Sequence, residues 1–240
     1  MQPLLMIDLD NTLIDRDAAF REACAAFLAA HGLPAADLDA LMEADASGYT
    51  PREPFTRWLA ERYGSRAPAE AVRTLLDGGG ADRTVLAPAT REALLRAAAA
   101  GWRCVIVTNG ETEQQEAKIR HTGLDALVHG WVISEAAGHK KPAPQIFHAA
   151  AAVAGAGSGA GAGAGGGGDA GARPVDAWMV GDSAAADIGG AHGLGIRSVW
   201  ISPTAAAWPE PAFRPTHTAP DVASAITYVL AAGPVGGDTA

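Results

Sequence analysis

The feature that most restricts the fold of this chain is an alternation of strand and helix patterns from Pro88 onward. Short apolar runs typical of buried strands alternate there with longer stretches of helical periodicity. The predicted strands are Arg103–Val107, one within Leu127–Ile133, Ala177–Val180 and Ser198–Ile201. The predicted helices are Thr90–Ala100, Thr112–His121, Pro142–Val153, Ala184–His192 and Asp221–Leu230. This alternation predicts a parallel sheet covered by helices on both faces.

A further apolar run, Leu4–Leu9, predicts a first strand near the start of the chain. From Asp15 to about Thr84 the patterns are helical. The helices predicted there are Ala18–His31, Asp37–Glu43, Pro54–Arg62 and Pro68–Leu76. We therefore expect a doubly wound α/β core made of residues 1–14 and 85–240. A helical cap domain, residues 15–84, would be inserted after the first strand.

Two segments of the core are predicted as loops. Residues 155–171 are almost all glycine and alanine, which predicts a flexible surface loop because such a chain buries little and loses much entropy on ordering. A glycine-rich phosphate cradle would need a strand before it and a helix after it, and here the order is reversed. The proline-rich segment 203–220 is interpreted as a surface connection.

Composition and charge exclude several classes of partner. The 240 residues carry a net charge of −9 and only three lysines, Lys118, Lys140 and Lys141, so nucleic acid is not an expected partner. No apolar run is long enough for a signal peptide core or a membrane span, so we expect a cytoplasmic protein without a membrane partner. Cys24 and Cys104 lie far apart and predict two reduced, packed thiols.

Acidic and polar residues gather at the predicted carboxyl ends of the strands, where doubly wound folds bind ligands. They are Asp8, Asp10, Thr108, Asn109, Gly110, Lys140, Lys141, Asp182 and Asp187. Asp182 taken alone is also compatible with a helix cap. Asp8 stands between Ile7 and Leu9 at the end of a buried strand, where an unpaired charge is costly. A cation would remove that cost, and Mg²⁺ prefers carboxylate oxygens and water.

Four motifs in this order resemble those of the haloacid dehalogenase superfamily. They are Asp8–Leu13, Thr108–Gly110, Lys141–Pro142 and Gly181–Asp187. The resemblance covers nearly the whole chain, and residues 15–84 are similar to the helical cap of one branch of this family. Ala143 departs from the family, which usually has an acid after the Lys-Pro pair. Lys141 is preferred to Lys140 because it directly precedes the proline.

The resemblance implies catalytic roles for four residues. Asp8 would be the nucleophile, and Asp10 the general acid and base. Thr108 and Lys141 would hold the transferring phosphoryl group. The residues predicted to contact phosphate or substrate beside them are Asn109, Gly110 and Arg16, the last because it closely follows the first motif.

The same resemblance implies a magnesium site. Asp8 and Asp182 would bind Mg²⁺ through their carboxylates, and Asp10 through its backbone carbonyl. Asp187 would either reach the metal or orient Lys141. The implied cofactor is therefore Mg²⁺, held by Asp8, Asp10, Asp182 and Asp187.

These roles predict a magnesium-dependent phosphatase that hydrolyses a small phosphorylated metabolite through an aspartyl phosphate on Asp8. The presence of Asp10 disfavours a dehalogenase, because a leaving halide needs no acid. Residues 15–84 contain no lysine, which disfavours a phosphonatase that uses a Schiff base. Two alternatives stay open: a sugar-phosphate mutase and a weakly active protein that binds a phosphorylated metabolite. Both a monomer and a dimer are compatible with the sequence.

Overall fold

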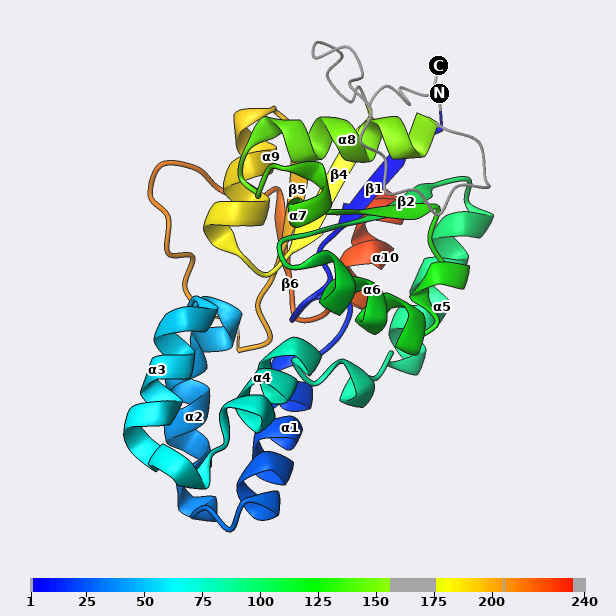
Figure 1. Cartoon of the computed structure of the whole chain (residues 1–240). Helices are drawn as coiled ribbons and strands as arrows, with labels where there is room; N and C mark the ends of the chain where they lie inside the picture. Colours follow the sequence, from blue (N-terminus) through cyan, green and yellow to red (C-terminus); the bar gives the residue numbers. More distant parts are fainter. Residues whose placement is uncertain (1, 156–175, 205, 235–240) are drawn as a thin grey trace, which may run out of the picture. The chain divides into compact units, whose positions relative to one another are not determined.

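A computed structural model describes residues 2–155, 176–204 and 206–234 (Figure 1). The predicted glycine-alanine loop, 155–171, therefore lies outside the described residues except for Gly155. Contacts along the chain divide it into two compact units. The first comprises Met1–Ile14, Leu86–Gln115 and Gly123–Ala240, and the second Asp15–Val85 and Glu116–Thr122. The assignment of residues 15–84 to an inserted cap domain stays a prediction.

A parallel sheet of six strands forms the centre of the first unit. The strands are β1 (Leu4–Ile7), β2 (Arg103–Thr108), β3 (Gly130–Ile133), β4 (Ala177–Gly181), β5 (Arg197–Ile201) and β6 (His217–Ala219). Their order in the sheet is β3-β2-β1-β4-β5-β6, and every neighbouring pair is parallel. Along the chain, β2 and β3 are added on one side of β1, and β4, β5 and β6 are then added on the other side. This is a doubly wound sheet, and it confirms the predicted fold class.

Helices cover both faces of this sheet, as the near-continuous apolar strands require. The helices of the first unit are α5 (Pro88–Ala99), α7 (Ser134–Ala137), α8 (Pro144–Gly155), α9 (Gly190–Gly193) and α10 (Val222–Ala232). A further helix, α6 (Thr112–His121), begins in the first unit and ends in the second. Figure 1 shows α8 on one face and α5 and α10 on the other. Leu4 and Met6 of β1 pack in a cluster with Phe147 of α8. Leu5 and Ile7 alternate to the opposite face and are also fully buried.

Four helices of the second unit share an apolar core. They are α1 (Arg16–Ala30), α2 (Leu38–Asp45), α3 (Arg52–Tyr63) and α4 (Ala69–Gly78), each within a few residues of its predicted position. Asp15 caps α1 by accepting a hydrogen bond from the Ala18 N–H (2.8 Å), which fixes where this helix begins. Phe20 and Leu28 of α1 pack with Phe55 and Leu59 of α3. In the described part of the chain, no helix combines the length and apolar character needed to cross a membrane.

Two sequence predictions for the first unit were wrong. The helix predicted from Pro142 begins at Pro144, because the chain first makes a turn in which the Ala143 N–H donates to the Lys140 carbonyl (2.8 Å). The segment 203–220, interpreted as a surface connection, contains β6, which pairs with β5. Two of the three β6 residues, His217 and Thr218, are exposed, so this strand has almost no apolar signature.

Both cysteines are free and buried, as the sequence predicts. Burial raises the pKa of the Cys104 thiol to about 12. Burial and the nearby Asp45 carboxylate do the same for Cys24. Both thiols are therefore inert, packed side chains at neutral pH.

The close packing of α9 against α8 gives a test of the fold. A Cβ atom on Gly190 would lie 2.5 and 2.6 Å from two ring atoms of Phe147, which is fully buried. We expect Gly190→Ala to lower the free energy of unfolding by about 1–3 kcal/mol, because an overpacked core must shift. Gly193→Ala, in the same helix but with no atom within 4 Å of its Cβ position, should be neutral or slightly stabilising. Urea unfolding of both variants measures this, and equal midpoints would contradict it.

Candidate active site

Three neighbouring strands end at one edge of the sheet and supply the first residues of the site. Asp8 directly follows β1, Thr108 is the last residue of β2, and Asp182 directly follows β4. Because β1 lies between β2 and β4, these residues reach the edge side by side. The Asp8 N–H donates to the Val180 carbonyl (2.9 Å), so the pairing of β1 with β4 fixes Asp8 at the point where the strand stops.

A buried ammonium group joins two of the acidic residues. Lys141 Nζ donates to Asp8 Oδ1 (2.6 Å), to Asp187 Oδ1 (2.7 Å) and to the Val107 carbonyl (2.7 Å). An ammonium group has three donors, so all are used. Both acids and the lysine are buried, and water screens their charges little. Burial alone would lower the pKa of Lys141, but the charges of Asp187 and Asp8 together outweigh it and raise this pKa above its ordinary value.

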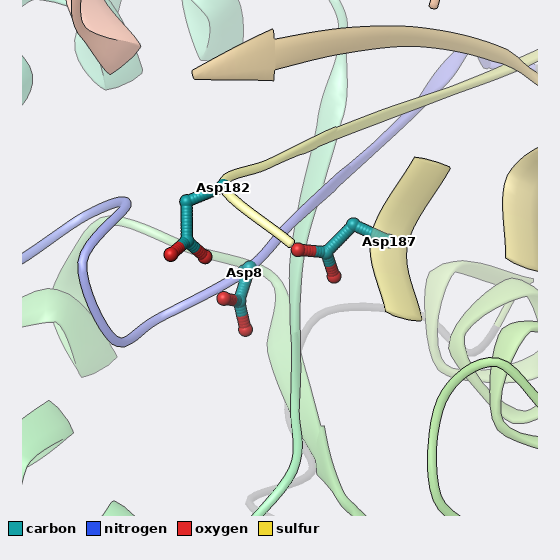
Figure 2. Close-up of side chains that lie close together, drawn as sticks. All are labelled: Asp8, Asp182 and Asp187. Atoms are coloured by element: carbon teal, nitrogen blue, oxygen red, sulfur yellow. The ribbon is translucent and has the colours of Figure 1, made fainter. Parts of the chain in front are cut away.

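Figure 2 shows three carboxyl groups, those of Asp8, Asp182 and Asp187, lying close together. One oxygen from each lies within 4.8 Å of the others. Burial raises the pKa of Asp8 well above its ordinary value, with Lys141 opposing and Asp187 and Asp182 adding to the effect. Burial, and then the charge of Asp187, raises the pKa of Asp182 to about 6. The protein groups alone therefore leave an excess of negative charge at this place.

This set of donors suits a divalent cation of the magnesium type. Carboxylate oxygens are the ligands that such a cation prefers, and its charge would offset the burial and the carboxylate repulsion that together raise the pKa values of Asp8 and Asp182. Asp187 already accepts from Lys141 at Oδ1 and from the Ser183 N–H at Oδ2 (3.0 Å). That arrangement fits an orienting role for Asp187 better than direct ligation. The Asp10 carboxylate is not one of the three that converge.

The backbone of Lys141 is held by Asn109. The Lys141 N–H donates to Asn109 Oδ1 (2.8 Å), and Asn109 Nδ2 donates back to the Lys141 carbonyl (3.1 Å). This pair of bonds ties the loop after β2 to the turn before α8, and so places the lysine side chain. The neighbouring Lys140 is exposed. The structure thus separates two lysines that are adjacent in the sequence, and it places the side chain of Asn109 on the backbone of Lys141.

Asp10 and Thr108, the other two predicted catalytic residues, both accept hydrogen bonds from one glutamine. Gln115 Nε2 donates to Asp10 Oδ2 (3.0 Å) and to Thr108 Oγ1 (2.7 Å). Thr108 and Gln115 are each 1% exposed. Asp10 lies beyond the end of β1, where the chain turns: the N–H groups of Leu13 and Ile14 both donate to the Leu9 carbonyl (3.0 and 3.2 Å).

Two residues predicted to contact phosphate have other partners in the structure. The Gly110 N–H donates to Ser134 Oγ (3.0 Å). Arg16 forms a buried two-bond ion pair with Asp45 of the same unit, with Nη2 to Oδ1 at 2.9 Å, and stacks over the Phe20 ring. A contact of either residue with phosphate stays a prediction.

The sequence interpretation missed the supporting roles of three residues, of which it had named only Gly181, as part of a motif. Trp200, near the end of β5, donates from Nε1 to the Asp182 carbonyl (2.7 Å). A Cβ on Gly181 would lie 2.2 Å from Asp187 Oδ2, so only glycine leaves room for that carboxylate. Gln115 lies in the first turn of α6, shortly after β2 ends at Thr108, but a glutamine in a polar helix gives no signal of this contact in the local sequence.

A family model described as haloacid dehalogenase-like hydrolase matches residues 3–195. Glyceraldehyde 3-phosphate phosphatase from Pyrococcus furiosus is 33% identical over 114 residues, which cover 48% of this chain and 41% of that relative. Ribulose-1,5-bisphosphate 5-phosphatase from Halopiger xanaduensis is 30% identical over 153 residues, 62% of this chain and 57% of that relative. The chain thus spans about half the length of these curated relatives.

Solved structures show the same fold over nearly the whole chain. YfnB from Bacillus subtilis, solved bound to magnesium, superposes with a TM-score of 0.69 at 20% sequence identity. The match covers 95% of this chain and 98% of YfnB. At this level of identity the likeness concerns the fold alone.

The converging carboxylates predict that Asp182→Asn weakens Mg²⁺ binding. Changes outside the ligand shell commonly cost 10- to 100-fold in metal affinity, so loss of a ligand charge should cost at least about tenfold. Calorimetric titration with Mg²⁺ measures this, with Asp125→Asn, an exposed aspartate before β3, as the matched control. Unchanged affinity in Asp182→Asn would remove Asp182 from the metal site.

The same variant should fold well without metal. The pKa of Asp182 is raised in the folded chain to about 6 from an ordinary value of 3.8, so its ionisation destabilises the folded state as the pH rises through that window. A neutral asparagine does not ionise, so this loss of stability with rising pH is absent in the variant. At pH 7 in chelator, thermal unfolding of Asp182→Asn should therefore occur at no lower temperature than in the wild type.

Proposed function

Because the chain belongs to the haloacid dehalogenase-like hydrolase family, we propose that it is a magnesium-dependent phosphatase that acts on a small phosphorylated metabolite through a covalent phosphate on Asp8. The observation that carries this proposal is the buried contact of Lys141 with both Asp8 and Asp187, beside Asp182. Such a group of charges holds an anionic nucleophile ready while compensating the charge of an anionic substrate. The relatives named above are phosphatases of small phosphate esters, which supports the proposal.

The first step would transfer the phosphoryl group to the protein. A carboxylate oxygen of Asp8 attacks phosphorus, and the bond from phosphorus to the ester oxygen breaks. Asp10, protonated at this stage, gives its proton to that leaving oxygen, so the product departs as an alcohol. Lys141 and the hydroxyl of Thr108 stabilise the negative charge on the phosphoryl oxygens during transfer.

The second step would return Asp8 to its starting state. Asp10, now ionised, takes a proton from water as the water oxygen attacks phosphorus. The bond from phosphorus to the Asp8 oxygen then breaks, and inorganic phosphate leaves. Two easier displacements thus replace one difficult hydrolysis. When bound by Asp8, Asp182 and the Asp10 carbonyl, Mg²⁺ would supply positive charge opposite the phosphoryl oxygens.

The substrate class follows from the relatives and from the charge of the chain. Glyceraldehyde 3-phosphate and ribulose 1,5-bisphosphate, which the relatives are named for, are both short sugar-type phosphates. A net charge of −9 is unfavourable for a polyanionic substrate such as nucleic acid. A small phosphorylated metabolite is therefore the proposed substrate.

Asp8→Asn is the first test of this proposal. The amide has nearly the shape of the carboxylate but is a poor nucleophile, so phosphate release should fall by roughly 10⁴-fold or more. The measurement is phosphate release from a panel of small esters, including glyceraldehyde 3-phosphate and p-nitrophenyl phosphate, with Mg²⁺ and with chelator. Asp125→Asn controls for the chemical change at an exposed position and should keep full activity. Turnover that persists in Asp8→Asn would reject the mechanism.

Asn109→Ala separates a positioning role from phosphate contact. If Asn109 acts by holding the Lys141 backbone, its loss should lower kcat on the order of 10²-fold with little change in KM, because small displacements of a catalytic group cost that much. If it binds phosphate directly, KM should rise instead. Lys140→Ala, which removes the exposed neighbour of Lys141, should change neither constant.

A further inference from the structure

The glutamine between Asp10 and Thr108 has a role that the four motifs do not include. Gln115 lies on α6, and its amide nitrogen contacts both side chains, at 3.0 Å from Asp10 Oδ2 and 2.7 Å from Thr108 Oγ1. All three residues belong to the first unit. The contact is buried, since Gln115 is 1% exposed, so water competes little with these bonds.

In the structure the amide NH₂ of Gln115 faces Asp10 Oδ2, and the amide oxygen does not. This orientation suits a carboxyl oxygen that accepts a hydrogen bond. The same nitrogen has a second hydrogen, and it is directed at the Thr108 hydroxyl oxygen. Both donors of the amide are therefore assigned by the geometry.

We propose that Gln115 is a positioning residue that sets the proton arrangement of Asp10 and Thr108 for phosphoryl transfer, an inference that rests on the proposed function. Because Oδ2 of Asp10 accepts from Gln115, the proton that Asp10 carries as an acid is placed on Oδ1. The carboxyl group is thus held with its acidic oxygen turned away from the glutamine. The proton that Asp10 gives to the leaving oxygen comes from that Oδ1.

The same contact decides what the Thr108 hydroxyl does. A hydroxyl group has one donor and can accept at its lone pairs. The bond from Gln115 occupies an accepting position, so the hydroxyl proton points away from the glutamine and is available to a phosphoryl oxygen. Without Gln115 the hydroxyl could rotate and donate elsewhere, for example to Asp10.

Close packing keeps the glutamine in this place. A Cβ atom on Gly110 would lie 2.9 Å from both Cγ and Cδ of Gln115, closer than such atoms approach one another. The side chain therefore passes directly over the Gly110 backbone. The absence of a side chain at Gly110 leaves this space to the glutamine, which is a reason for glycine at this position. The hydrogen bond of the Gly110 N–H to Ser134 is not, because any residue except proline could donate it.

The test compares leaving groups. Gln115→Leu removes both hydrogen bonds, and Gln115→Glu keeps the shape but places a carboxylate, which cannot donate, against Asp10. An alkyl ester needs a proton on its leaving oxygen, whereas p-nitrophenolate leaves without one. Both variants should lose about 10- to 100-fold in kcat/KM, which reports the first transfer and not the later hydrolysis common to all esters, with the best alkyl phosphate of the panel, and several-fold less with p-nitrophenyl phosphate. Gln114→Glu, the same change at the preceding helix position, should match the wild type with both esters.

The outcomes separate this inference from the proposed function. Equal losses in kcat/KM with the two esters would show that Gln115 does not set the proton that Asp10 gives to the leaving group. Unchanged values would show that it does nothing for the first transfer. Either result overturns the inference while the phosphatase stands. A wild type that releases no phosphate from any ester rejects the proposed function, and the inference with it. If Gln115→Leu does not fold, as circular dichroism would reveal, the near-isosteric Gln115→Glu decides.

Discussion

The site depends on one electrostatic arrangement, the ammonium group of Lys141 enclosed between Asp8 and Asp187. A buried lysine without partners would lose its proton, and buried aspartates without a cation would gain one. The two carboxylates keep Lys141 charged, and the charge of Lys141 in turn opposes the protonation of Asp8 that burial favours. The rest of the site is built around this contact: Asn109 fixes the backbone of the lysine, and Ser183 fixes the second oxygen of Asp187.

Glycines make this dense group of charges possible. Gly181 leaves the space that the Asp187 carboxylate fills, and Gly190 lets the segment that follows pack against Phe147. The segment Ala184–Gly189 between them is a π-helix, which opens directly after Ser183 caps its start. Wider helical turns of this kind are frequent at functional sites, and here one presents Asp187 to Lys141.

Most of the fold was predictable because the strands of a parallel sheet are buried on both faces and read as apolar runs. β6 was not, since His217 and Thr218 are exposed and its pairing with β5 is decided by tertiary contacts. The acids at the strand ends were predictable from their position in the pattern and from the family resemblance. Gln115 was not singled out, because a glutamine in a polar helix looks like an ordinary surface residue until its partners are known. The start of α8 was misplaced because the hydrogen bonds of Asn109 to Lys141 are not visible in the local sequence.

The pairing of the central strand has a consequence for how the chain acquires its site. β1 pairs on one side with a strand that begins at Arg103 and on the other with one that begins at Ala177, so the residues around Asp8 come from three distant parts of the chain. Such non-local pairings form slowly, because long loops must close before any contact compensates the lost entropy. The charged group at the end of β1 is therefore assembled only when both pairings exist. A partly folded or partly synthesised chain carries the separate acids without the site, and the appearance of the site marks the pairing of β1 with both of its neighbours.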